Sequence, residues 1–278
     1  MAASEAAAQS AAACRADLTS FSALRSLTIR SWTFFYAGSV LEFLPPRCKL
    51  EHLEVTCPRD IHPDECQTVI DAIQHYCNPQ SLRSIEFYDC TDPDVRLNPE
   101  PLDVDPGNDE DDEDSGDDVD IWKLSQFTKL ATLIIRWGGE MRLRREDIPK
   151  LVETWPYLEH LDLCSIQYSD GRIPAFDHND VLKIVQRLPS LHFLGLRFDA
   201  TQLPREQTTA SSTSPPRLLT LRVGESPISS PSRVVKFLND NFPRLKGLDT
   251  QYISPPSRQV PTMLDKRWAQ VTKSLFQV

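Results

Sequence analysis

The sequence predicts an α/β fold in which short parallel strands alternate with helices along a solenoid, with about eight strands in one concave sheet. Three observations lead to this expectation. An L-x-x-L-x-L pattern recurs along the chain, proline precedes many of its copies, and the segments between copies carry apolar stripes with helical spacing. Strands joined by helices pair in parallel through right-handed crossovers. We therefore expect a right-handed superhelix with repeats of irregular length.

The pattern occurs eight times, and each copy predicts a strand. The copies are LRSLTI from Leu24, LEHLEV from Leu50, LRSIEF from Leu82, LATLII from Leu130, LEHLDL from Leu158, LHFLGL from Leu191, LLTLRV from Leu218 and LKGLDT from Leu245. The steps between successive copies are 26, 32, 48, 28, 33, 27 and 27 residues. Units that recur in this way bury their apolar faces on one another, so the copies predict a stack of strand–helix repeats.

The segments between the copies predict helices. Four copies begin with P-x-L, at Pro156, Pro189, Pro216 and Pro243. Proline lacks the amide N–H and clashes with the preceding turn, so it ends a helix before each strand. Apolar residues spaced i, i+3, i+4 and i+7 indicate the helices themselves. These stripes are Cys66, Val69, Ile70 and Ile73; Ile148, Leu151, Val152 and Trp155; Val181, Ile184, Val185 and Leu188; and Val234, Phe237, Leu238 and Phe242.

The two ends of the chain depart from the repeat. Residues 1–17 are rich in alanine and predict a flexible tail, so the solenoid should span 18–278. After the last copy, an apolar stripe predicts a helix at about 261–276 that caps the open end of the solenoid. The stripe consists of Leu264, Trp268, Val271 and Leu275.

Two internal segments also depart from the repeat. Residues 98–120 form an acidic insert with eleven carboxylates and no Lys or Arg between Asp103 and Asp120, which predicts disorder. Removing these eleven negative charges from the formal net charge of −10 leaves +1, so the remainder of the chain is nearly neutral. Residues 201–217 predict a surface loop rich in Ser, Thr and Pro.

The repeats resemble the irregular leucine-rich repeats of the ribonuclease-inhibitor-like type, in particular the repeat region of fungal F-box proteins. The stretch LRSIEFYDC, Leu82 to Cys90, has the full L-x-x-L-x-L-x-x-C form, and the resemblance covers about residues 18–278. It implies a leucine-rich-repeat solenoid that recognises substrates for a Skp–cullin–F-box ubiquitin ligase. No F-box is recognisable, because the L-P-P at Leu44 runs directly into the second repeat. Contact with a Skp-type adaptor therefore stays open, and a free-standing scaffold or inhibitor-like binding protein is the alternative.

The composition argues against several other classes of protein. Hydrophobic residues make up 40% of the 278 residues, yet no run is long enough for a membrane-spanning helix. Seven cysteines occur without a C-x-x-C pair, which favours neither a disulfide framework nor a zinc site and indicates an intracellular protein, cytoplasmic or nuclear. No nucleotide-binding, hydrolase or metalloprotease motif is present, so we expect no catalysis, no metal and no cofactor.

The positions between the leucines predict a partner-binding surface. In L-x-x-L-x-L-x they face away from the core, on the concave side that solenoids use for partners. This face mixes Arg, carboxylate and aromatic side chains, as protein interfaces do, and has no basic stripe for nucleic acid. We expect a monomer that binds a protein partner there. The residues expected to contact the partner are Arg30, His52, Glu54, Glu86, Tyr88, Arg136, His160, Asp162, Arg197, Arg222 and Asp249.

The acidic insert and one aromatic cluster have further interpretations. An EF-hand alignment of the insert places Trp122 where a bidentate glutamate is required, so we do not expect calcium binding. In a self-masking arrangement the insert would instead dock on the chain's own arginines. Those arginines are Arg136, Arg142, Arg144 and Arg145. Trp32, Phe34, Phe35 and Tyr36 follow the first strand, and we expect Phe34 and Phe35 to seal the N-terminal end of the solenoid.

Overall fold

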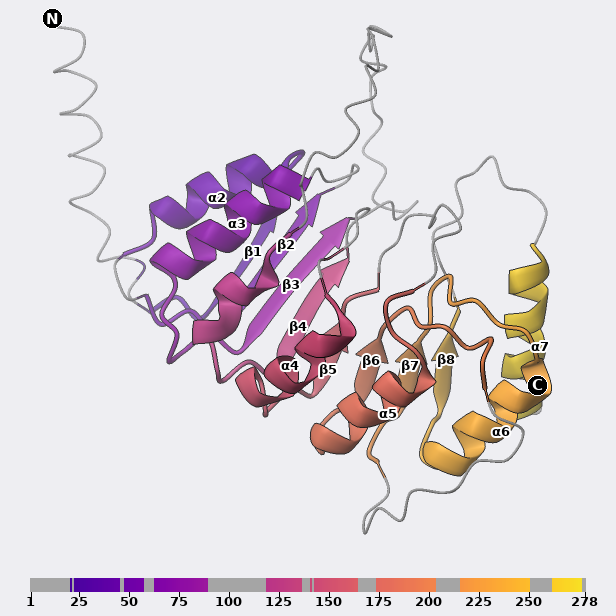
Figure 1. The fold of residues 1–278 in the computed structure, drawn as a ribbon. Helices are drawn as coiled ribbons and strands as arrows, with labels where there is room; N and C mark the ends of the chain where they lie inside the picture. Colours follow the sequence, from indigo (N-terminus) through magenta and orange to yellow (C-terminus); the bar gives the residue numbers. More distant parts are fainter. Residues whose placement is uncertain are drawn as a thin grey trace, which may run out of the picture.

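A computed structural model of the chain has an α/β architecture in which one parallel sheet alternates with helices (Figure 1). The structure describes residues 21, 23–45, 48–57, 63–89, 119–136, 141, 143–164, 174–203, 216–250 and 262–276. The tail at 1–17, most of the acidic insert and most of the loop at 201–217 lie outside these residues.

Within the described residues, eight strands form one sheet in the order of the chain. They are β1 (Ser26–Arg30), β2 (His52–Cys57), β3 (Ser84–Asp89), β4 (Thr132–Arg136), β5 (His160–Asp162), β6 (Phe193–Gly195), β7 (Thr220–Arg222) and β8 (Gly247–Asp249). Every neighbouring pair is parallel, and the register aligns the second apolar position of each copy, from Leu27 opposite Leu53 to Leu221 opposite Leu248. The expected parallel sheet is therefore confirmed, and its arrangement is solenoid-like.

The helices lie together over one face of this sheet (Figure 1). They are α2 (Phe34–Glu42), α3 (Pro63–Tyr76), α4 (Ile148–Thr154), α5 (His178–Arg187), α6 (Pro231–Asn241) and α7 (Met263–Phe276), with two short 3-10 helices, η3 (Ile121–Gln126) and η4 (Arg145–Asp147). The four apolar stripes predicted from the sequence lie on α3, α4, α5 and α6, with the last residue of the latter three at the C-cap, and every residue in them is buried. The core therefore lies between the helices and the sheet, where leucines from both sides meet.

Local sequence explains where several of these helices begin. Proline stands at the first position of α3 and of α6, where its missing N–H costs nothing and its fixed φ favours the helix. The Asp177 carboxylate begins α5 by accepting hydrogen bonds from the backbone N–H groups of Asn179 and Asp180. The expected terminal helix is present as α7, whose Trp268 is buried and donates from Nε1 to the Ser226 carbonyl oxygen at 2.8 Å.

The region around α2 differs from expectation. Three residues of the aromatic cluster, Phe34, Phe35 and Tyr36, begin α2, and Trp32 precedes it. The two phenylalanines differ in burial. Phe34 is buried and its ring lies edge-on to Phe87, 5.3 Å between centroids, whereas Phe35 is 58% exposed. Of the two residues expected to seal the N-terminal end of the solenoid, only Phe34 is buried, because adjacent residues of a helix point about 100° apart.

The C-terminal end of the predicted acidic insert overlaps the fold. Val119 is buried in the core, and Asp120 caps η3 by accepting a hydrogen bond from the Trp122 N–H at 2.9 Å. The last two residues assigned to the insert therefore belong to the fold.

Candidate functional site

The parallel register lines up the positions between the leucines into rows on the face of the sheet opposite the helices, here called the open face. The middle row consists of Thr28, Glu54, Glu86, Ile134, Asp162, Gly195, Arg222 and Asp249, each opposite the next. Beside it, Arg30, Thr56, Tyr88 and Arg136 lie opposite one another. Five of the predicted partner-binding residues thus share one row, although they come from five different repeats.

Two glutamates lie side by side on β2 and β3. Glu54 accepts long hydrogen bonds from two threonine hydroxyls, at 3.4 and 3.5 Å. Glu86 accepts shorter ones, 2.7 Å from the Ser84 hydroxyl and 2.6 Å from the Tyr88 hydroxyl. Both side chains are half-buried, and neither is ion-paired within the part of the chain that the structure describes. Burial and the hydrogen bond to Glu86 raise the pKa of Tyr88, so this phenol keeps its proton and remains a donor.

Asp162 on β5 lies at the centre of a cluster of alternating charges. Nε of Arg136 donates to its Oδ2 at 2.7 Å, and Nη1 of Arg222 lies 3.5 Å from the same oxygen. Nε of Arg222 also lies 3.7 Å from Oδ2 of Asp249. On the other side, the Arg136 guanidinium lies 5.4 Å from the centroid of the Tyr88 ring, within the range of a cation–π contact. The cluster therefore connects β3 to β8 across the middle of the open face.

The burial of this cluster corrects part of the sequence-based expectation. Asp162 has no exposed surface and Arg222 is only 6% exposed, so neither is accessible to a partner as predicted. A carboxylate enclosed by two arginines loses little by leaving water, since its charge is neutralised and its oxygens are hydrogen-bonded. Arg136 remains within reach of a partner, because 26% of its side chain is exposed.

Gly195 on β6 makes room for the buried carboxylate. A Cβ at this position would lie 2.0 Å from Oδ1 of Asp162, far shorter than the non-bonded contacts that Cβ atoms make. The same Oδ1 accepts a hydrogen bond from the Cys164 N–H at 3.2 Å. Sequence reasoning placed Gly195 on the open face but missed this role. This role could have been inferred from the repeat alignment, which places Gly195 opposite Asp162 on the neighbouring strand.

A stacked pair of rings adjoins the cluster. The imidazole of His160 lies 4.1 Å from the Phe193 ring between centroids, with 19° between the planes. Burial lowers the pKa of His160, although the nearby Asp162 charge acts in the opposite direction. The neutral imidazole and the phenyl ring therefore give this part of the open face a flat, largely apolar character.

The remaining predicted residues lie outside the central cluster. Arg30 and His52 are exposed on β1 and β2. Arg197 follows β6, is half-buried and donates from Nε to the Glu225 carbonyl oxygen at 3.4 Å. Of the predicted set, the structure thus buries Asp162 and Arg222 and leaves the other residues partly or fully exposed.

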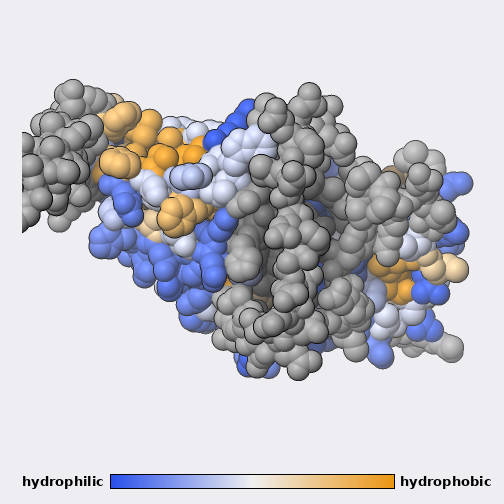
Figure 2. All heavy atoms as spheres, turned by 90° about the horizontal axis from the view of Figure 1, so that it is seen from above, coloured by the Kyte–Doolittle hydropathy of each residue, from blue (hydrophilic) through white to orange (hydrophobic). Residues whose placement is uncertain are grey.

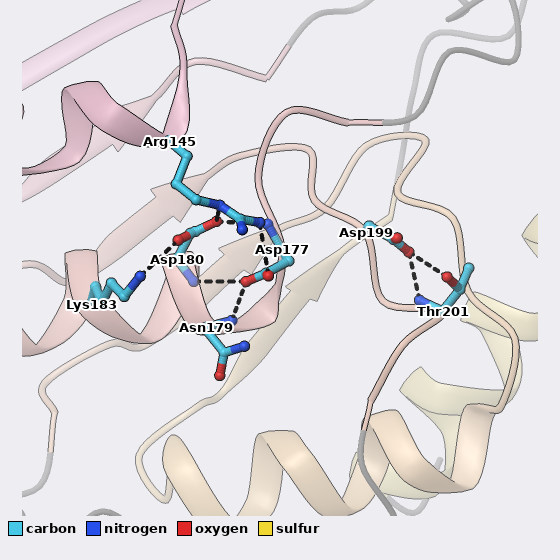
Figure 3. A network of polar contacts seen from close by, with 7 residues as sticks. All are labelled: Arg145, Asp177, Asn179, Asp180, Lys183, Asp199 and Thr201. Atoms are coloured by element: carbon cyan, nitrogen blue, oxygen red, sulfur yellow. Dashed lines mark hydrogen bonds and ion pairs between the residues drawn. The ribbon is translucent and has the colours of Figure 1, made fainter.

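A second polar network lies at the start of α5 (Figure 3). Arg145 extends from η4 and pairs with Asp177 at 2.8 Å and with Asp180 at 2.7 Å, and Lys183 lies 3.2 Å from Asp180. Burial alone would raise the pKa of Asp177, but hydrogen bonds from the Asp180 and Asn179 N–H groups and the charge of Arg145 lower it. These contacts tie one repeat to the next, so the network has a structural role.

The same contacts bear on the self-masking hypothesis for the acidic insert. Two of the four arginines considered for docking, Arg136 and Arg145, are already paired with aspartates of the fold. Arg142 lies outside the described residues. Two of the cations proposed to attract the insert therefore have strong partners elsewhere.

The described cysteines show no sign of reactivity. Cys48, Cys57, Cys66, Cys77 and Cys164 are all free and buried. Burial raises the pKa of Cys66, and it raises the pKa of Cys77 and of Cys164 to about 12. A nucleophilic or metal-binding cysteine needs an accessible thiolate, so these thiols are packing residues.

Comparison with family models finds no match to this chain, and comparison with curated proteins finds none either. None of the helices in the described ranges is long and apolar enough to cross a membrane. Fold and site together define the class, a solenoid-like α/β protein whose sheet presents a mixed polar and aromatic face.

Proposed function

We propose that this chain is a non-catalytic protein-recognition module of the leucine-rich-repeat type and that its open face binds a protein partner. The observation that carries the proposal is the pair Glu54 and Glu86. Their carboxylates lie on adjacent strands, half-buried, and hydroxyl groups are their only hydrogen-bond partners among the described residues. A carboxylate held in this way gains most from a cation supplied by a partner.

The surroundings of the two glutamates support a peptide or protein ligand. Arg136 and the stacked rings of His160 and Phe193 continue the same face toward the C-terminal repeats. Protein interfaces combine charged groups at their rim with aromatic contacts of this kind. The partner segment we propose therefore places Lys or Arg against Glu54 and Glu86 and an apolar side chain against the rings.

The test compares partner capture by wild-type chain and by the double variant Glu54→Gln, Glu86→Gln. Proximity labelling followed by quantitative mass spectrometry supplies the readout. We expect the variant to label a small set of proteins at least about tenfold less than wild type does. A tenfold drop in affinity corresponds to about 1.4 kcal/mol of binding free energy, which the loss of one charge-assisted contact can account for. Glu146→Gln with Glu153→Gln removes the same charge from exposed positions on the helix side and is the matched control. Equal labelling by wild type, the double variant and the control would show that the open face is not the binding surface.

We propose further, on the resemblance to F-box-associated repeats, that the partner is a substrate for ubiquitination and that the chain acts inside the cell as a substrate receptor. The alternative is a free-standing scaffold or inhibitor-like binding protein. Co-purification with a Skp-type adaptor and a cullin separates the two. If neither co-purifies while the labelled partners persist, the ligase connection is wrong and the recognition role stands.

A further inference from the structure

The first helix of the solenoid is apolar on nearly every side. Phe34, Ala37 and Leu41 face the core and are buried. Its exposed side carries Phe35, Tyr36 and Val40, and Phe43 follows at its C-terminal cap. A helix that is apolar all round is normally buried, so this side of α2 lacks the cover that its sequence requires.

Among the described helices only α2 exposes aromatic side chains, although α7 exposes Met263 at its start. The exposed residues of α3, α5 and α6 are all polar or charged. They are Asp64, Thr68, Asp71, Gln74 and His75; Asn179, Lys183, Gln186 and Arg187; and Ser232, Lys236, Asn239 and Asp240. Figure 2 shows apolar residues gathered at the end of the molecule where Figure 1 places α2. The patch is thus a property of the N-terminal end of the solenoid.

The patch is large enough for a stable interface. Its six members are between 40 and 62% exposed, namely Phe21, Trp32, Phe35, Tyr36, Val40 and Phe43. An aromatic side chain has roughly 200 Å² of surface, so the patch exposes about 600 Å² in all. Two such patches pressed together would bury about 1,200 Å², the lower bound for specific protein interfaces, before any polar contact is added.

The sheet has a free edge at the same end. Among the described strands, β1 pairs only with β2, so its outer edge presents unpaired backbone N–H and C=O groups. At the other end of the solenoid, α7 packs against α6 and buries Trp268. Among the described strands β8 likewise pairs only with β7, but the exposed aromatic patch lies beside β1, so a head-to-head stack of two N-terminal ends brings patch against patch.

We propose that a second copy of this chain covers the patch, forming a symmetric head-to-head dimer in which α2 packs on its equivalent and the two β1 strands pair antiparallel. A two-fold axis through Thr28 would place Ser26 of each copy opposite Arg30 of the other. No like charges then stand directly opposite each other in the new strand pair. This inference does not rest on the proposed function, and it replaces the monomer expected from the sequence.

The test measures the molar mass of the full chain by light scattering during gel filtration, up to about 100 μM, because interfaces of this size have dissociation constants from micromolar downward. We expect twice the chain mass of 31.6 kDa. The double variant Phe35→Ser, Phe43→Ser should elute at the monomer mass with an unchanged thermal midpoint, since both side chains are more than half exposed. Tyr157→Ser, at an exposed aromatic residue on a distant turn, is the matched control and should remain dimeric.

Two results would overturn the proposal. The first is a wild-type chain that stays monomeric throughout. If deletion of residues 1–20 then produces a dimer, the chain's own N-terminal segment is the occupant of the patch. The second is a double variant that remains dimeric, which would place the interface elsewhere on the molecule.

Discussion

Gly195→Ala should destabilise this protein severely, although it adds a single methyl group to the open face of the sheet, where Gly195 is buried. The added Cβ would lie 2.0 Å from Oδ1 of Asp162. The carboxylate cannot swing away cheaply, because it is fully buried, is held by Arg136 at 2.7 Å and lies 3.5 Å from Arg222. Either the two strands separate or the ion pairs break. Overpacking costs about 1–3 kcal/mol, and disrupting a buried ion pair costs about 3–5 kcal/mol, so we expect a loss of about 3 kcal/mol.

Equilibrium unfolding in urea measures this loss as a lower midpoint with an unchanged slope. Gly247→Ala is the matched control. Its Cβ would lie 3.4 Å from the Thr220 side chain, an ordinary contact, so the free energy of unfolding should change by less than about 1 kcal/mol. In an Asp162→Ala background the carboxylate is gone, and Gly195→Ala should add little, with a coupling of about 2 kcal/mol between the two sites. Equal midpoint shifts for the two glycine variants would refute the steric argument.

Three further outcomes follow from buried groups. The first concerns the five buried cysteines, studied in a chain that carries Cys14→Ser and Cys90→Ser. A thiol reagent should label this chain slowly when it is native and at five sites when it is unfolded in urea. Fast labelling of the native chain would contradict the packing role. The five cysteines are Cys48, Cys57, Cys66, Cys77 and Cys164. Burial lowers the pKa of His178 below the ordinary 6.5, so the unfolded chain takes up the proton first and the free energy of unfolding falls as pH drops through 6.5. His178→Gln should make that dependence shallower in urea titrations between about pH 7.5 and 5.5, leaving the share of His160, whose pKa burial also lowers. An unchanged slope would assign the dependence to other groups. Trp268→Ala should cost about 3–5 kcal/mol, because it removes a buried ring and leaves α7 without its anchor, and a smaller loss in urea unfolding would argue against α7 as a cap.

The sheet could be predicted from sequence in detail, and the reason is periodicity. Each L-x-x-L-x-L copy places three apolar side chains on one face, and a slip of one residue would turn them all toward water. The register from Leu27 to Leu248 is therefore determined by the pattern alone. Helix α2 could not be predicted in the same way, because its sequence lacks a clear apolar periodicity. Its nine residues are apolar on the exposed side as well as the buried one, so no stripe with helical spacing stands out.

The state of the candidate site could be predicted only in part. The repeat alignment placed Glu54, Glu86, Asp162 and Arg222 correctly in one row of the open face. It could not show that Asp162 is buried, because burial depends on Gly195 in the next repeat and on the reach of two arginines. Whether an alternating strand position is accessible is decided by its neighbours across the sheet.

The two proposals meet at the same end of the molecule. Glu54 and Glu86 lie on β2 and β3, next to the free edge of β1. In a head-to-head dimer the two β2 strands would be three strand spacings apart, about 14 Å, because neighbouring strands are about 4.8 Å apart. The four glutamates would repel one another at low salt, where the screening length is about 30 Å, and much less at physiological salt, where it is about 8 Å. Dimerisation should therefore strengthen as salt is added, while binding of a basic partner should weaken. Sedimentation at low and physiological salt tests this, and a dimer that dissociates on adding salt would place the glutamates away from the two-fold axis.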